Sequence, residues 1–159
     1  MTTKSIPAGY HTLTPHLVVT GAAKAIEFYK KAFNADELVR LAGSDGRSIM
    51  HAALQIGDSQ FFLVDESPAM CAKSPLSLGG TPVTIHRYVE DVDAAFKQAT
   101  GAGAQTVMPP SDMFWGDRYA VITDPFGHKW SLASHKEDLT PEEIGERAQA
   151  FFQQSGGCA

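Results

Sequence analysis

Hydrophobic and polar residues alternate over positions 12–19, with the two-residue period of a strand that buries one face. The period lengthens to that of a helix over positions 22–33, and Thr20-Gly21 precedes this run as its expected N-cap. Three further strands with intervening turns follow, at 37–41, 48–56 and 59–65, with turns at 44–47 and at Gly57-Asp58. Residues 12–65 are therefore predicted to form one βαβββ module.

The same order of elements returns after a segment rich in Pro, Ser and Gly at 66–80, which is predicted to be a linker. The second set is a strand, a helix capped by Asp91 and three more strands, at 81–89, 92–100, 105–108, 118–123 and 129–135. A loop at 109–117 separates the second strand of this set from the third. Residues 81–135 are therefore predicted to form a second βαβββ module.

A final helix is predicted over residues 140–154. Thr140-Pro141-Glu142-Glu143 forms a capping box with proline at the first helical position. An apolar stripe follows at helical spacing and consists of Ile144, Ala148, Phe151 and Phe152.

An offset of 70 residues aligns the two halves and places Thr14-Pro15-His16 over Thr84-Ile85-His86, which indicates duplication of one unit. Helices can cover one face of each sheet, and the other face is then left to curve around a cavity. The predicted fold is a single α+β domain over residues 1–159. In it, two tandem βαβββ modules form a concave mixed sheet around a cavity, with the helices on the outer face.

Composition narrows the class of protein. The 159 residues are 43% hydrophobic and 19% charged, which is typical of a globular chain. Thirteen Lys and Arg against 18 Asp and Glu give a net charge of −5, so a nucleic-acid partner is not expected. Cys71 and Cys158 form no CxxC motif, and the sequence shows neither a signal-peptide core nor a membrane-length apolar run. A soluble cytoplasmic protein without a membrane partner is expected.

Five segments together resemble the vicinal-oxygen-chelate superfamily, namely IEFYKKAFNADE, GDSQFFLVDE, YVEDVDAAFKQATGAGA, MFWGDRY and DPFGHKWSLASH. This superfamily includes glyoxalase I, bleomycin-resistance proteins and extradiol dioxygenases. WGDRY paired with DPFGHxW is similar to the PhnB-like branch in particular, and the resemblance covers about residues 10–140. It implies paired βαβββ modules around a ligand site, in a homodimer whose subunits share that site.

The resemblance also implies where a family-type metal would be held. Its first-strand ligands fall on Thr14 and Thr84, and its last-strand ligands fall on Phe61, to within one residue, and Ser131. Divalent ions are held by imidazole, carboxylate or thiolate groups, and none stands at these places. The sequence therefore predicts no metal at the family-type site and no cofactor.

Two histidines leave an alternative open. His16 and His86 each lie two residues beyond the first-strand position, hence on the same face of the strand and about 6–7 Å further along it. With His51 as a third ligand they could hold a metal in a shifted site. They could equally contact a bound ligand or serve only as hydrogen-bonded structural residues. His51 alternates with Ala53, where the PhnB-like branch often carries a glutamate, and is expected to face the cavity.

The loop before the penultimate strand is rich in aromatic residues. Phe114, Trp115 and Tyr119 surround Asp117 and Arg118, so the rings could stack on a planar ligand while Arg118 holds an anionic or carbonyl group. The alternative is that Trp115 seals the loop and Arg118 pairs with Asp117.

These observations predict a metal-free, homodimeric protein that binds a small molecule, for example by sequestering a drug-like compound or a metabolite. The predicted ligand-binding residues are His16, His51, Phe61, His86, Trp115, Arg118 and Ser131. One rival is a lyase, isomerase or dioxygenase that uses a displaced metal at His16 and His86, or a metal-free epimerase with either histidine as general base. The other rival is a structural dimer whose cavity is filled by side chains.

Overall fold

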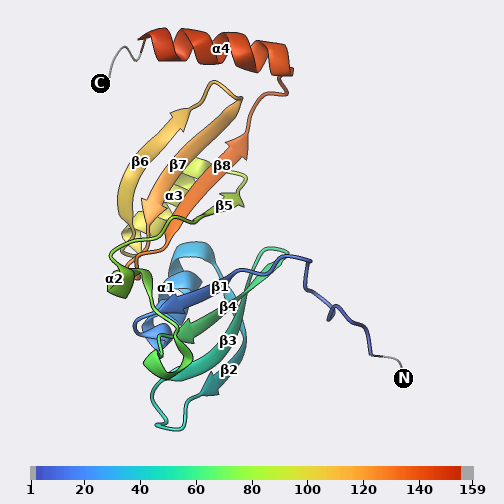
Figure 1. Cartoon of the computed structure of the whole chain (residues 1–159). Coiled ribbons are helices and arrows are strands. Elements are labelled where there is room, and N and C mark those ends of the chain that lie inside the picture. Colours follow the sequence, from blue (N-terminus) through green and yellow to red (C-terminus); the bar gives the residue numbers. More distant parts are fainter. Residues whose placement is uncertain (1–2, 155–159) are drawn as a thin grey trace.

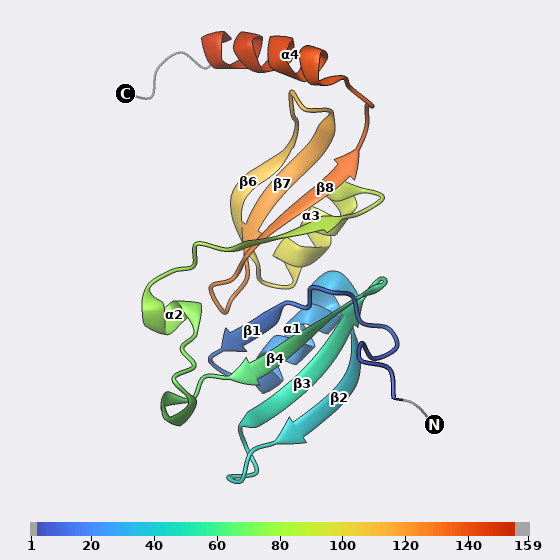
Figure 2. The same ribbon diagram turned by 45° about the vertical axis from the view of Figure 1, so that its right-hand side comes forward.

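The computed structural model describes residues 3–154 and shows two modules that follow one another, with a last helix beyond the second (Figures 1 and 2). The first module contains β1 (His16–Val19), α1 (Ala22–Phe33), β2 (Asp36–Ala42), β3 (Ile49–Ile56) and β4 (Ser59–Asp65). The second contains β5 (Thr84–Tyr88), α3 (Val92–Gly101), β6 (Gln105–Asp112), β7 (Asp117–Thr123) and β8 (Lys129–His135). A 3-10 turn (Pro68–Met70) and the short helix α2 (Pro75–Leu78) lie between them, and α4 (Pro141–Gln154) comes last.

Each module has its own four-stranded mixed sheet, in the orders β1-β4-β3-β2 and β5-β8-β7-β6. In both sheets the first strand runs parallel to the last, and the remaining pairs are antiparallel. The predicted α+β fold of two tandem βαβββ modules is confirmed. No helix within the described residues is both long and apolar enough to cross a membrane.

Three strands differ in length from the sequence-based expectation by more than one residue at an end. The strand predicted at 81–89 is shorter and spans Thr84–Tyr88. The strand predicted at 12–19 begins only at His16, and the short strand predicted at 105–108 runs on through Pro109 and Pro110 to Asp112. The prolines are tolerated because β6 is an edge strand, and its pairing with β7 shifts register between Met108 and Ser111. The loop that precedes β7 is correspondingly shorter than predicted.

The N-terminus of α1 is capped from a distant strand. Gly21 occupies the N-cap position with φ +89° and has no side chain to offer, while the hydroxyl of Thr20 contacts the Ser74 hydroxyl at 2.8 Å. The Asp65 carboxylate at the end of β4 instead accepts hydrogen bonds from the Gly21 and Ala22 amides at 2.9 and 2.8 Å. A carboxylate at the N-terminus of a helix is favourable because the first amides have no partner within the helix and because the positive end of the helix dipole lies there.

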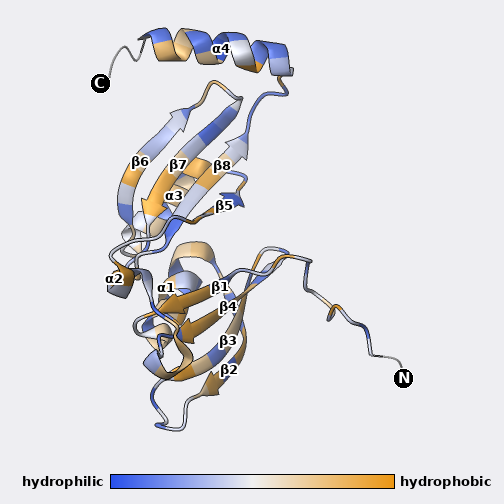
Figure 3. Cartoon of the chain, viewed as in Figure 1, coloured by the Kyte–Doolittle hydropathy of each residue, from blue (hydrophilic) through white to orange (hydrophobic). Residues whose placement is uncertain are grey.

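A single hydrophobic core spans both modules. In the first, Ile26, Tyr29 and Phe33 of α1 are buried against β1 and β4, and in the second, α3 packs on β7 and β8. The two helices also pack on each other, so that each sheet has one face covered by helix and core. Figure 3 shows that β1 and β4 are hydrophobic along most of their length, which leaves apolar side chains on the uncovered face as well.

A buried carboxylate joins the modules. Asp124, in the turn between β7 and β8, accepts hydrogen bonds from the Tyr29 hydroxyl of α1 at 2.6 Å and from the Trp130 indole at 3.0 Å. The backbone amides of Phe126 and His128 complete its partners, each at 2.9 Å. Burial, followed by the negative charge of Asp124, raises the pKa of Tyr29 well above its ordinary value, so the phenol remains the donor. The hydrogen bond from Tyr29 of the first module to the buried Asp124 carboxylate of the second therefore helps to hold the two modules together.

A second hydrogen-bonded cluster ties the end of β8 to the aromatic loop. The buried carboxylate of Asp117 accepts from the Trp115 indole at 3.1 Å and contacts Nδ1 of His135 at 2.8 Å. Nε2 of His135 lies 3.0 Å from the carboxylate of Asp138, on the segment that leads to α4. Asp138, and then Asp117, raises the pKa of His135, because only the imidazolium can donate to both carboxylates. The predicted capping box of α4 is confirmed by reciprocal bonds between Thr140 and Glu143.

Removing the phenol that reaches Asp124 should destabilise the whole chain. We expect Tyr29→Phe to lower the free energy of unfolding by about 1–3 kcal/mol, because a buried hydrogen bond to a charged acceptor is lost. Tyr88→Phe makes the same change on an exposed side chain and should stay within about 0.5 kcal/mol of the natural protein. Urea unfolding followed by circular dichroism measures both, and equal effects would contradict the assigned role of Asp124.

His135 should make stability depend on pH. Its folded-state pKa is raised above 6.5, so its stabilising contribution is complete below pH 6.5 and is lost as pH rises through the raised value. We expect His135→Gln to lower the melting temperature more at pH 5.5 than at pH 8.5. Arg147→Gln removes an ion pair with Glu137 that stays charged at both pH values, so its effect should not change between them. A constant deficit for His135→Gln would contradict this interpretation.

Candidate functional site

The face of each sheet that the helices leave uncovered is called its open face below. Along β1, Leu17 and Val19 are buried toward α1, so His16 and Val18 lie on the open face of the first sheet. The strand register places His16 beside Phe62 of β4, and Ala53 of β3 beside Phe62 from the other side. His51 lies two residues before Ala53 and therefore on the same face, as predicted from its alternation.

Phe62 is the centre of an aromatic group on this open face. Its ring centroid lies 5.0 Å from that of His51 and 6.0 Å from that of His16. The ring centroid of Tyr10, in the segment before β1, lies 5.5 Å from that of Phe62. Two imidazoles and a phenol thus border one phenyl ring, which makes an apolar floor with a polar rim.

The structure corrects the register of β4 by one residue. Phe61, which was expected at the last-strand position of the cavity, is only 4% exposed and turns toward α1. Its ring packs on Tyr29 at 5.4 Å and on Trp130 at 6.3 Å. Phe62 occupies the expected position instead. Two consecutive phenylalanines give the same alternation signal in either register, so only the strand pairing could separate them.

The open face of the second sheet carries a histidine–serine pair. Nδ1 of His86 lies 2.7 Å from the hydroxyl oxygen of Ser131, and the register pairs these residues directly across β5 and β8. Ser131 is buried, whereas Tyr88 and Tyr119 flank the imidazole at 4.7 and 6.1 Å between ring centroids. Tyr88 lies two residues from His86 on the same strand, so alternation alone could have identified it.

Trp115 extends this second open face, whereas Phe114 does not. The Trp115 ring lies 5.5 Å from that of Tyr119, next to the face that carries His86 and Ser131. Phe114 packs on Phe151 and Phe152 of α4 at 5.5 and 6.0 Å. The aromatic loop is therefore shared between the open face and the attachment of the last helix.

Arg118 lies on the opposite side of the sheet from Ser131. It alternates with Ala120 and Ile122, which are buried toward α3, and it forms a bidentate contact with Asp93 of that helix. A third carboxylate contact is made to Asp112 at 3.0 Å, and the two partners raise the pKa of Arg118. Arg118 does not point to the open face, and it does not pair with Asp117. Its placement therefore gives no support to a ligand-binding role.

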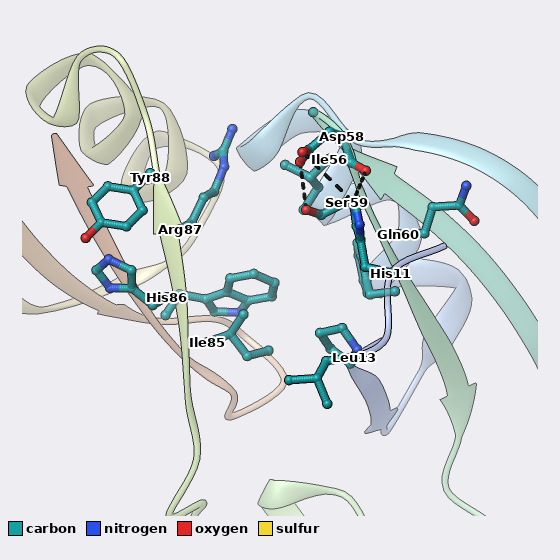
Figure 4. A pocket seen from close by; sticks show the side chains of 14 residues that line it. His11, Leu13, Ile56, Asp58, Ser59, Gln60, Ile85, His86, Arg87 and Tyr88 are labelled. Carbon is teal, nitrogen blue, oxygen red and sulfur yellow. Dashed lines mark hydrogen bonds and ion pairs between the residues drawn. The ribbon is translucent and has the colours of Figure 1, made fainter. Parts of the chain in front are cut away.

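Seven predicted residues are thus distributed over three environments. His16 and His51 share the first open face, His86, Ser131 and Trp115 share the second, and Phe61 and Arg118 face the helices. A separate groove of about 490 Å³ lies between the modules, and of the seven predicted residues its lining includes only Phe61 and His86. Figure 4 shows this groove between β5 and the β3–β4 hairpin.

The residues do not fit a family-type metal centre. The last-strand positions are held by the phenyl ring of Phe62 and by Ser131, whose hydroxyl is already engaged by His86. Within residues 3–154, no group of three or more His, Cys, Asp or Glu side chains is arranged to hold a metal ion. What the arrangement offers is aromatic and aliphatic surface with imidazole, hydroxyl and phenol groups, which suits hydrogen bonding and stacking.

Comparisons with known proteins agree with this architecture. Protein Rv0887c of Mycobacterium tuberculosis is 53% identical over 135 residues, which cover 83% of this chain and 79% of that protein. The crystal structure of TioX from Micromonospora sp. ML1 superposes with a TM-score of 0.64 at 27% identity, over 79% of this chain and 98% of TioX.

A further likeness concerns the fold alone. The PhnB protein from Bacillus cereus superposes with a TM-score of 0.60 at 15% identity, over 78% of this chain and 99% of that one. Residues 10–132 match the family model described as Glyoxalase/Bleomycin resistance protein/Dioxygenase superfamily. The chain belongs to the glyoxalase/bleomycin resistance protein/dioxygenase superfamily.

Proposed function

We propose that this protein binds a small molecule on the open faces of its two sheets and does so without a metal ion. The observation that carries the proposal is the pair of last-strand residues, Phe62 and Ser131. A phenyl ring has no lone pair to donate, and a serine hydroxyl that contacts an imidazole at 2.7 Å is a poor ligand for a divalent ion. Membership of a family that includes bleomycin resistance proteins supports sequestration as the outcome of binding.

The side chains favour a planar, largely apolar ligand with at least one polar group. Phe62 and Val18 present apolar surface on the first face, and Tyr88 and Tyr119 present rings on the second. Aromatic rings bury large areas and stack in offset or edge-on geometries with other rings. The His86–Ser131 pair can donate or accept one hydrogen bond to a polar group of the ligand.

A second copy of the chain is proposed to complete the site. Each open face is solvent-accessible in the single chain although it carries large apolar side chains, with Leu41 48% exposed on the first and Tyr88 65% exposed on the second. Exposed apolar surface of this kind marks protein or ligand interfaces. In a two-fold dimer, the first open face of one subunit would lie opposite the second open face of its partner, and both would line one cup.

An enzymatic alternative has one observation in its favour. His16 and His51 both border the Phe62 ring on the first open face, and His86 lies on the open face of the other sheet. A dimer that closes the cup as proposed would turn three imidazoles toward one space. A lyase, isomerase or dioxygenase with a displaced metal is therefore the second candidate, and metal content separates it from the first.

Metal content and ligand binding test the proposal together. Protein purified without an affinity tag should contain far less than one equivalent of Mn, Fe, Ni or Zn per chain by mass spectrometry. A planar aromatic ligand at about 100 times its Kd should add about 2.7 kcal/mol to the free energy of unfolding. Phe62→Ala should weaken that affinity tenfold or more by loss of stacking, whereas Phe152→Ala on α4 should not change it. A stoichiometric metal lost in the His16→Ala, His86→Ala variant would establish the enzymatic alternative.

Oligomeric state tests the shared cup. We expect a dimer in sedimentation velocity at micromolar concentration, and Leu41→Glu should shift it toward monomer by placing a charge on the apolar open face. Leu78→Glu makes the same change at a 64% exposed position of α2, which belongs to neither sheet, and should leave the dimer intact. A monomeric natural protein, or equal effects of the two variants, would contradict the shared site.

A further inference from the structure

The groove between the modules is lined by a cation, Arg87, that forms no ion pair with any residue in the described part of the chain. Arg87 of β5 lines it, and the guanidinium makes one hydrogen bond, to the Phe33 carbonyl oxygen at 3.4 Å. Its central carbon also lies 5.3 Å from the centroid of the Phe33 ring. Phe33 ends α1, so part of the role of Arg87 is to cap the negative end of that helix. Within residues 3–154, four of the five guanidinium donors have no protein partner.

Arg87 differs in its partners from Arg118, the other partly buried arginine of the described chain. Within residues 3–154, Arg118 and Arg87 are the arginines of intermediate burial, and Arg118 is held by Asp93 and Asp112. Arg87 has no carboxylate within ion-pair distance in the same part of the chain. Desolvation lowers the pKa of Arg87, because partial burial disfavours the charged guanidinium and no ion pair within residues 3–154 offsets this effect. A bound anion would remove that cost.

The groove borders the second open face, because His86 and Tyr88 are also among the residues that line it. Figure 4 shows His86 and Tyr88 on one side of β5, whereas Arg87 reaches toward Ile56 and Asp58 of the β3–β4 hairpin. The lower part of the groove in the same view is lined by Ile85 and Leu13. Phe61 and Trp130 complete its apolar walls. One end therefore offers the Arg87 guanidinium, with the Asp58 carboxylate on the facing hairpin, and much of the rest offers carbon surface.

We propose that this inter-module groove is a second ligand site, which binds an apolar monocarboxylate with its carboxylate on Arg87. Guanidinium and carboxylate form paired hydrogen bonds, and the partial burial of Arg87 strengthens them. The volume of about 490 Å³ is that of a site for a small organic ligand. Asp58 on the facing hairpin disfavours di- and trianions such as organic phosphates, because a second negative charge would lie near its carboxylate.

Matched acid and amide pairs test the site on the full chain. Octanoate, 4-phenylbutanoate and 2-naphthoate are each compared with the corresponding primary amide by isothermal titration calorimetry. We expect at least one acid to bind tenfold or more tightly than its amide. Arg87→Gln should remove that preference by weakening the acid tenfold or more while changing the amide less than twofold. Arg87→Lys should retain part of it, and Arg118→Gln should leave it unchanged.

A variant on an exposed wall covers the case in which Arg87→Gln fails to fold. Leu13 is 87% exposed, so Leu13→Glu should fold and should weaken the acid, but not the amide, by placing a negative charge in the groove. Phe62→Ala changes only the open face and should leave acid affinity within twofold, which keeps this result independent of the proposed function. Equal affinities for acid and amide, equal losses for both in Arg87→Gln, or no binding by any acid up to 10 mM would overturn the proposal.

Discussion

One buried carboxylate joins the two modules on either side of the inter-module groove. Asp124 is 3% exposed and receives four hydrogen bonds, from the Tyr29 hydroxyl, the Trp130 indole and the amides of Phe126 and His128. A buried charge is tolerated only where its hydrogen-bonding capacity is filled, so these donors cannot move independently. Because Tyr29 belongs to α1 and the other donors to the second module, the same contacts join the two modules, together with the packing of α1 on α3. The inter-module groove lies beside this junction, and Trp130 is one of the residues that line it.

The open faces follow from the fold of each module. One helix per four-stranded sheet covers one face, and strand alternation then sends every second side chain to the other. A few residues decide what that face can do. Phe62 and Ser131 place a phenyl ring and a hydroxyl group on these faces, and His16, His51 and His86 add imidazole groups beside them.

Two arginines show how the partner, and not the residue type, decides the role. Arg118 stands in the most recognisable motif of the chain, yet two carboxylates occupy it on the helix-covered side of the sheet. Arg87 stands in a strand without a recognisable motif, yet among residues 3–154 its guanidinium has polar or ring contacts with the carbonyl and ring of Phe33 alone. An occupied guanidinium stabilises the fold, whereas an unoccupied one beside a groove can bind an anion.

The sequence was enough to predict the order and type of the elements, the α4 capping box and the open-face placement of His51, because these features depend on residues close together along the chain. The repeated order of elements also indicated the duplication. Pairing between distant strands decided the rest. It placed Phe62 and not Phe61 on the open face, supplied Asp65 as the cap of α1, and extended β6 through two edge-strand prolines. It also carried Arg118 to α3 and left Arg87 at the groove. The alternation along a strand shows that the strand has two faces. The contacts that decide which face is buried join residues many positions apart in the chain, so they form only when the strands and helices pack together.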